Sequence, residues 1–205
     1  MNRRGLTLLE MILAIGITAT IGAAIASMMA AVSNGLTSRD DGRRTAVQLA
    51  TSQVRLSAYI APARCLLSKD ETAFAIWLND DRESNTVHAS EIRWLSFDAS
   101  NSLFTVKFVD FPDNWSQSMI DAADTECDEM TNYDTLLATF DTSGLINEFN
   151  LIDGMETCSI WTDDLDPQTA IRICIRFSLT TNFGPSSDAI VDESIRQHLP
   201  PQEQQ

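Results

Sequence analysis

Hydrophobic and polar positions divide the chain into two parts. Residues Met11 to Val32 form a run of 22 residues without a charged side chain. A helix rises about 1.5 Å per residue, so this run would be roughly 33 Å long, close to the thickness of a bilayer core. The pattern predicts a membrane-spanning helix over residues 6–33. The alternative is a cleaved secretory signal, because the small residues from Ala23 to Ala26 are similar to a signal-peptidase site.

Residues 34–61 continue the helical pattern and predict an amphipathic second half of the same helix. Pro62 biases Ala61 away from helical geometry and marks the end. Two stripes of apolar side chains run along this half, one of bulky residues and one of smaller residues. The bulky stripe comprises Leu49, Leu56 and Ile60, and the small stripe comprises Val47, Ala50, Val54 and Ala58. Either both stripes are core, or the bulky stripe packs on the chain's own sheet and the small one on neighbouring helices.

The pattern becomes strand-like after Pro62, and residues 62–196 are predicted to form a β-rich head. Alternating side chains predict strands within the ranges 73–79, 87–98, 103–111, 151–161 and 171–179. We expect the first three to form an antiparallel meander with one buried face. The acidic stretch 113–137 is predicted to be a surface insertion, and residues 197–205 a disordered tail. The predicted fold class is α+β, with a long N-terminal helical spine packed on antiparallel sheet.

Charge is distributed unevenly along the chain. The sequence has 14 Lys and Arg against 29 Asp and Glu, for a formal net charge of −15. Residues 1–33 have Arg3, Arg4 and Glu10 as their charged residues, so they carry +1 and the remainder carries −16. The acidic balance argues against a nucleic-acid binder. Two arginines ahead of the apolar run predict a single-pass protein with a cytoplasmic N-terminus and an exported body.

Cysteine usage fits an exported chain. The four cysteines form no C-x-x-C pair, which argues against a zinc ribbon or a thioredoxin-like site. Cys158 and Cys174 lie at equal distances from Asp166, so a symmetric hairpin would place them opposite each other. That pairing would leave Cys65 to bond with Cys127. The alternative is four reduced, buried thiols.

Residues with catalytic chemistry are sparse. His88 and His198 are the two histidines, and the sequence has no G-x-S-x-G, H-E-x-x-H or glycine-rich phosphate loop. We therefore expect neither an enzyme nor a cofactor. An acidic segment offers oxygen ligands for Ca²⁺ but lacks the spacing of an EF-hand, so a solvated loop without a metal is the preferred interpretation. Its carboxylates are Asp121, Asp124, Glu126, Asp128, Glu129 and Asp134.

The first ten residues read MNRRG-LTLLE and lead directly into the apolar run. They resemble the signal of type IV pilins and pseudopilins, which has a short basic leader ending in Gly, a hydrophobic first mature residue and a glutamate at the fifth mature position. The resemblance implies a leader at residues 1–5, cleavage by prepilin peptidase between Gly5 and Leu6, and N-methylation of Leu6. The usual first mature residue is Phe, so Leu6 departs from the pattern.

The resemblance also implies a role for Glu10 in assembly. A carboxylate at the centre of a membrane costs at least about 2.5 kcal/mol, so it needs a partner. In the pilin family this glutamate pairs with the N-terminus of a neighbouring subunit. Glu10 also argues against a K-type tip subunit, which typically lacks that glutamate.

Motifs in the C-terminal half resemble those of J-type minor pseudopilins and W-type minor pilins. They are the sequence LIDGME at residues 151–156, an acidic loop with Pro167, the sequence IRI at residues 171–173, and a late strand ending in Arg196. The resemblance implies a pilin-like fold, with the N-terminal helix as a spine.

Two classes of function follow from these patterns. The first is a minor pseudopilin of a type II secretion system or a minor pilin of a type IV pilus, a structural subunit that leaves the inner membrane and joins a filament. Its expected partners are prepilin peptidase, other pilin-like subunits bound through the N-terminal helix, and inner-membrane lipid. The second is a signal-anchored periplasmic binding module that does not assemble. A mature chain starting at Leu6 favours the first class, and one retaining Met1 favours the second.

Overall fold

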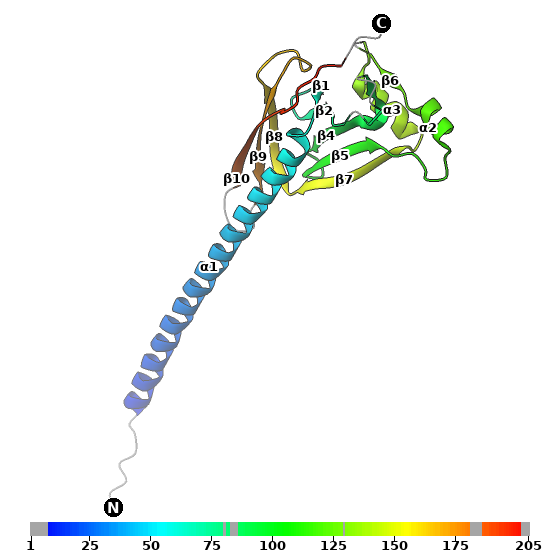
Figure 1. Ribbon diagram of the computed structural model, residues 1–205. Helices are drawn as coiled ribbons and strands as arrows, with labels where there is room; N and C mark the ends of the chain where they lie inside the picture. Colours follow the sequence, from blue (N-terminus) through cyan, green and yellow to red (C-terminus); the bar gives the residue numbers. More distant parts are fainter. Residues whose placement is uncertain (1–7, 80, 83–85, 129, 181–185, 202–205) are drawn as a thin grey trace, which may run out of the picture. The chain divides into compact units, whose positions relative to one another are not determined.

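The computed structural model describes residues 8–79, 81–82, 86–128, 130–180 and 186–201. The chain divides into two units, the first ending at Arg44 and the second beginning at Thr45. Helix α1 (Leu8–Ile60) contributes to both (Figure 1). Its sequence holds no proline, and it ends just before Pro62, where the Ala61 amide still donates to the Ser57 carbonyl. The helix predicted for residues 6–61 is confirmed from Leu8 to Ile60.

The first unit holds the apolar part of α1. Residues Met11–Ser33 have a mean hydropathy of 2.0 and are long and apolar enough to span a membrane. The hydroxyls of Thr18, Thr20 and Ser27 each donate to the carbonyl three residues earlier, at 2.8 to 3.2 Å. These polar groups therefore have partners inside the helix, as a lipid environment requires.

Among the described residues, five strands form one antiparallel sheet. They lie in the order β1 (Cys65–Lys69), β2 (Ala73–Trp77), β4 (Ile92–Asp98), β5 (Leu103–Val109) and β7 (Ile146–Asp153). The turn between β4 and β5 is tight and places Ser102 at a positive φ of 55°. The predicted meander of 73–79, 87–98 and 103–111 is confirmed, with the short strand β3 (Val87–His88) and the 3₁₀ helix η1 (Ala89–Glu91) before β4.

A second antiparallel sheet, again counted over the described residues, has three strands. They lie in the order β10 (Ser187–Ser194), β9 (Arg172–Leu179) and β8 (Met155–Thr162). Gly154, at a φ of +73°, separates β7 from β8, a backbone conformation that glycine adopts without a Cβ penalty. The single strand predicted for residues 151–161 is therefore wrong: its first part ends β7 in one sheet, and the rest is β8 in the other.

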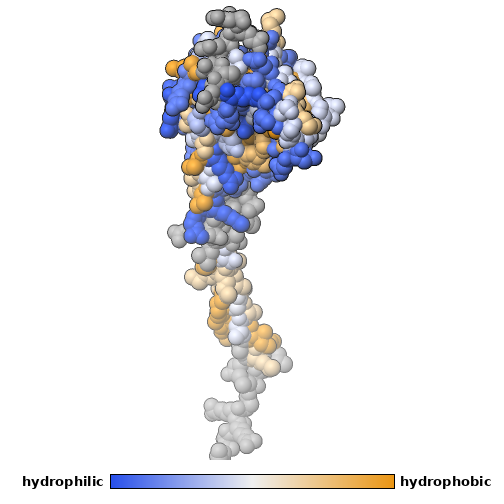
Figure 2. Space-filling model, turned by 45° about the vertical axis from the view of Figure 1, so that its right-hand side comes forward, coloured by the Kyte–Doolittle hydropathy of each residue, from blue (hydrophilic) through white to orange (hydrophobic). Residues whose placement is uncertain are grey.

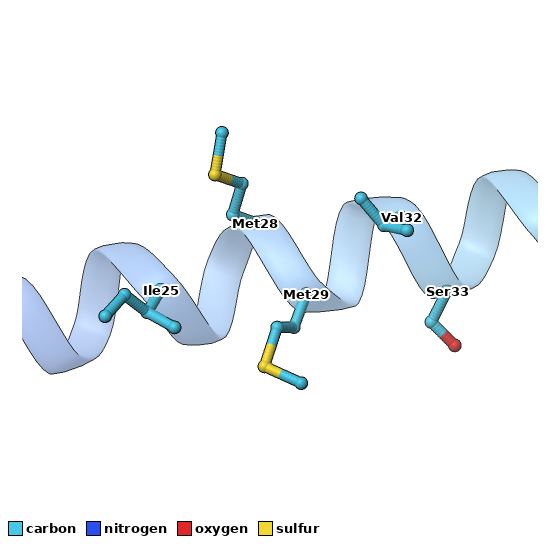
Figure 3. Close-up of a pocket in the computed structure, with 5 residues that line it drawn as sticks. All are labelled: Ile25, Met28, Met29, Val32 and Ser33. Atoms are coloured by element: carbon cyan, nitrogen blue, oxygen red, sulfur yellow. The ribbon is translucent and has the colours of Figure 1, made fainter.

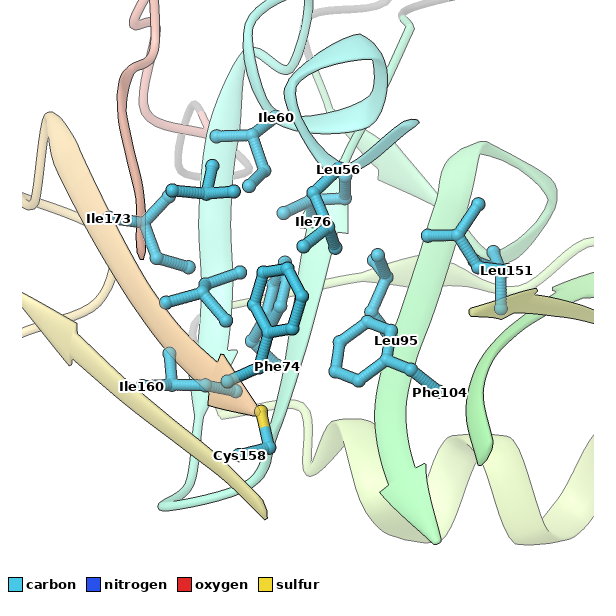
Figure 4. Packing of buried hydrophobic residues seen from close by; sticks show 14 of the residues in the cluster. Leu56, Ile60, Phe74, Ile76, Leu95, Phe104, Leu151, Cys158, Ile160 and Ile173 are labelled. Atoms are coloured by element: carbon cyan, nitrogen blue, oxygen red, sulfur yellow. The ribbon is translucent and has the colours of Figure 1, made fainter. Parts of the chain in front are cut away.

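The first hydrophobic cluster lies between the end of α1, one face of the five-stranded sheet and the three-stranded sheet. The helix supplies Leu56 and Ile60, and the two sheets supply aromatic and aliphatic side chains that point toward them (Figure 4). These include Phe74, Ile76, Leu95, Phe104, Ile160, Ile173 and Phe177. The fold is thus α+β, with an N-terminal helix packed on antiparallel sheets, as predicted.

A second hydrophobic cluster covers the opposite face of the five-stranded sheet. Trp77 and Trp94 point into it from the sheet, and residues of the acidic stretch cover them. The covering elements are β6 (Glu126–Cys127), which pairs with β3, and α3 (Tyr133–Thr142), whereas α2 (Gln117–Ala123) in the same stretch buries no side chain. Cys127, Tyr133 and Phe140 are buried there. Two expectations are therefore wrong: the meander has two buried faces, and the stretch 113–137 contributes to the core.

The C-terminal segment is attached to the second unit as far as it is described. The Leu199 amide donates to the Arg64 carbonyl at 2.9 Å, and the Arg196 amide donates to the Ala61 carbonyl at 3.4 Å. His198 Nε2 lies 2.9 Å from the Gln168 carbonyl oxygen. The disordered tail predicted for residues 197–205 is therefore wrong for residues 197–201, and residues 202–205 lie outside the described part.

Candidate functional site

The predicted processing and assembly residues fall at the edge of the described structure. Gly5 and Leu6 lie outside the described residues. Glu10 lies in α1, but its side chain is also outside what the structure describes. Cleavage, methylation and the pairing of Glu10 therefore stay predictions.

The apolar part of α1 presents bare hydrophobic side chains. Ile25, Met28, Met29 and Val32 project from successive turns of α1 and are 55% to 73% exposed (Figure 3). Figure 2 shows hydrophobic colours along this part of α1, whereas hydrophilic colours cover much of the second unit on the face in view. This surface is suited to lipid or to other apolar helices rather than to water.

The last part of α1, within the second unit, has two different faces. Thr45, Ser52, Leu56 and Ile60 are buried at intervals of seven, four and four residues, and Leu49 packs partly buried against the same cluster. The other face carries Val47 and Val54, which are 62% and 69% exposed, together with exposed Ala50 and Ala58. The interpretation that both stripes are core is wrong, and the bulky stripe is confirmed as the one that packs on the sheets.

Long polar side chains from α1 bind carbonyls at the borders of both sheets. Arg55 donates to the Leu151 carbonyl at 2.8 Å, and Gln48 donates to the Asp153 carbonyl at 3.0 Å. On the other side, Gln53 donates to the Ile190 carbonyl at 2.9 Å. Each bond pairs a backbone acceptor that the sheet itself leaves open. The helix is therefore fixed on both sides, which determines which face stays exposed.

The register of the β8–β9 hairpin contradicts the predicted Cys158–Cys174 disulfide. Cys158 lies opposite Phe177, and Cys174 lies opposite Trp161, so the two cysteines are three positions out of register. Side chains alternate between the faces of a strand, so an odd shift places the two thiols on opposite faces. Cys158 is accordingly buried in the first cluster, whereas Cys174 is half-buried.

The second predicted pair, Cys65 and Cys127, shares the second hydrophobic cluster but is not bonded. All four cysteines of the described chain are free thiols. The Cys65 thiol donates to the carbonyls of Leu66 and Gln168, each at 3.4 Å. Burial raises the pKa of Cys65, Cys127 and Cys158 to about 12 in each case.

These pKa values predict selective alkylation of the folded protein. At pH 8 a thiol with a pKa of about 12 is about one part in 10⁴ thiolate, the form that reacts. We expect iodoacetamide to label Cys174 at least about tenfold faster than the three buried cysteines, as measured by peptide mass mapping. Unfolding in denaturant should equalise the four sites. Linked peptides, or protection of Cys174 in the folded state, would contradict the free-thiol arrangement.

A buried polar cluster joins the acidic stretch to the sheet. Glu91 is 2% exposed and accepts hydrogen bonds from Trp77 Nε1 and the His88 amide, both at 3.1 Å. Asp124 accepts from the Ser90 amide and hydroxyl at 2.9 and 2.7 Å, and it pairs with Arg82 at 3.0 Å. The donors satisfy both buried carboxylates, so the cluster holds β3, η1 and β6 together.

Metal coordination has no visible donor set in the described part of the chain. No group of three or more His, Cys, Asp or Glu side chains there is placed to hold a metal ion. Of the predicted acidic segment, Asp121 and Asp124 share the guanidinium of Arg82, and Glu129 lies outside the described residues.

Comparisons of the chain with protein-family models, curated proteins and solved structures found no match.

Proposed function

We propose that this protein is a minor pseudopilin or minor pilin of the J-type or W-type, a structural subunit with a pilin-like fold. Three features support the proposal: the MNRRG-LTLLE leader, the membrane-length apolar helix and the continuation of that helix into the second unit. In this proposal the N-terminus is cytoplasmic, the second unit is periplasmic, and the chain has no catalytic role.

The exposed stripe of α1 is the observation that carries the proposal. A helix that served only as a tether and a core element would need one apolar face. This helix buries one face and exposes a second, made of Val47, Ala50, Val54 and Ala58, along the same stretch. Small and β-branched side chains allow close packing of neighbouring helices. We infer that this face contacts the helices of other pilin-like subunits in a filament.

The proposed sequence of events follows from the leader and the stripe. Prepilin peptidase cleaves the chain between Gly5 and Leu6 and methylates the new amine of Leu6. The mature subunit remains in the inner membrane until assembly, where Glu10 pairs with the N-terminus of a neighbour and sets its register. The second unit is then carried into a periplasmic pseudopilus or the tip of a pilus, where it serves protein secretion or surface extension.

Mass spectrometry of the native N-terminus tests this proposal. We expect membranes with active prepilin peptidase to contain a chain that begins at N-methylated Leu6, and membranes without the enzyme to contain a chain that begins before Gly5. A Gly5→Val variant should stay unprocessed in both, whereas the matched control Asn2→Ala should be processed normally. A chain that retains Met1 in the presence of the peptidase would contradict the proposal and favour a signal-anchored periplasmic binding module.

A further inference from the structure

We propose that the outer edge of β7, from Ile146 to Asn150, binds an extended segment of another protein as an added antiparallel strand. The segment carries a large apolar residue that faces Phe149, next to a Lys or Arg that faces Glu148. We call residues 146–150 the free edge. The inference is independent of filament assembly, because it concerns a different surface of the second unit.

The position of β7 exposes its backbone on one side. It is the last strand of the five-stranded sheet, and β5 is the one strand among the described residues that pairs with it (Figure 1). The Asp110 amide donates to the Leu145 carbonyl, which makes that pair a hydrogen-bonded one. Hydrogen-bonded and open pairs alternate along an antiparallel ladder, so the N–H and C=O groups of Ile146 and Glu148 point away from β5. No described residue bonds to these groups.

Side chains of α1 already bind backbone groups in the rest of the β7 edge, so only residues 146–150 remain available. Arg55 binds the Leu151 carbonyl, and Gln48 binds the Asp153 carbonyl. The edge strand β10 is treated similarly, because Gln53 binds the Ile190 carbonyl and Asp188 and Asp192 pair with arginines of β9. Natural sheets block their edges with such contacts, so an uncovered stretch with exposed residues on both faces is a candidate for strand addition.

Aromatic side chains flank the free edge on one face of the sheet. Phe149 is 37% exposed, and its ring centroid lies 6.1 Å from that of Tyr59 and 6.2 Å from that of Phe108. A residue of an added strand opposite Phe149 would lie on this face, beside the aromatic group. Cross-strand contacts of this kind favour a large apolar or aromatic partner side chain.

Carboxylates flank the free edge on the other face and select the charge of the partner. Glu148 is opposite Lys107 and pairs with it at 3.5 Å, but its side chain remains 45% exposed. Asp153 adds a further carboxylate at the end of β7, and Lys107 is the single lysine of β5 and β7. A Lys or Arg beside the apolar residue would face Glu148, since neighbouring side chains point to opposite faces.

The same charges disfavour a second copy of this chain as the occupant. Antiparallel pairing of two β7 strands about Glu148 would set that carboxylate against its own copy. Each chain also carries a formal net charge of −15, so two copies repel. A basic, extended segment of a different protein meets neither penalty.

Selection from a phage-displayed library of random short peptides tests the proposal on the full-length protein in detergent micelles. The matched variants are Glu148→Pro, which removes the outward N–H but no backbone hydrogen bond to β5, and Glu148→Ala, which keeps that N–H; both remove the ion pair with Lys107. We expect peptides with an apolar residue next to Lys or Arg to be enriched. We expect Glu148→Pro to lower the affinity for a selected peptide about tenfold, and Glu148→Ala to lower it about two- to fivefold.

Methylating alternate amides of the selected peptide is a second measurement that does not depend on the folding of any variant. It should abolish binding, because an added strand uses those N–H groups. The proposal is overturned if no peptide is enriched, or if the selected peptides bind equally well to Glu148→Pro and in the N-methylated form. It is also overturned if the wild type forms dimers that Glu148→Pro dissociates, since the occupant would then be a second copy.

Discussion

The Leu56→Ala variant is expected to lose about 2–5 kcal/mol of unfolding free energy in the second unit. Leu56 is fully buried where α1 meets both sheets, so removing three carbons leaves a cavity that few neighbours can fill. Chemical denaturation of the full chain in detergent, followed by the fluorescence of the buried Trp77 and Trp94, measures the loss. A loss of this size is a large part of the stability of an ordinary domain.

Val54→Ala is the matched control for this prediction. Val54 lies on the same helix two residues earlier, but its side chain is exposed in the single chain. We expect its unfolding free energy to change by no more than about 0.5 kcal/mol, because an exposed side chain makes few contacts that a substitution could remove. Equal losses in the two variants would mean that both stripes are core and would remove the observation on which the filament proposal depends.

The spine was predictable because its signals are local. The apolar run, the absence of proline and the stop at Pro62 each act within a few residues, and the helix follows them from Leu8 to Ile60. Local signals do not determine which of the two stripes is buried. Whether Val47 or Leu56 faces the sheets depends on contacts with residues far away in the sequence, and the larger side chains gain more by burial.

The contribution of the acidic stretch to the core does not follow from its composition, because its many charges surround a short apolar helical face. Tyr133, Leu136, Leu137 and Phe140 lie at positions i, i+3, i+4 and i+7, the spacing of one helical face. Asn132 provides the start signal, since its side chain accepts hydrogen bonds from the amides of Asp134 and Thr135. The buried face of α3 is therefore encoded in the spacing of its apolar residues, whereas the mean polarity of the stretch indicates only a solvated surface.

The disulfide prediction failed for a different reason. Its symmetric hairpin assumed that residues equidistant from Asp166 would be paired. The observed register pairs Cys174 with Trp161, and β8 also contains an irregularity between Met155 and Thr157. A register is determined by which side chains reach the core, so the loop alone does not determine it. The polar contacts of Gln48, Gln53 and Arg55 could not be predicted either, because their acceptors lie 96 to 137 residues away in the sequence.

Phe140→Ala is the second substitution for which we expect a large effect, about 3–5 kcal/mol of unfolding free energy. Phe140 is buried at the end of α3, where its ring meets that of Phe111 edge-on with centroids 6.4 Å apart. The acidic stretch covers the face of the sheet that carries Trp77 and Trp94, so loosening α3 exposes both indoles. If the stretch were instead a peripheral insertion, the substitution would change the unfolding free energy little.

Met119→Ala in the same stretch is the control that separates these two outcomes. Met119 is exposed on α2, a helix with no buried side chain, so we expect a change within about 0.5 kcal/mol. Alkylation gives a second readout: Phe140→Ala should accelerate labelling of Cys127, which shares the cluster, while Cys158 in the other cluster stays protected. If Phe140→Ala costs less than about 1 kcal/mol and leaves Cys127 protected, the second cluster does not stabilise the sheet. In that case the acidic stretch is the surface insertion that its composition first indicated.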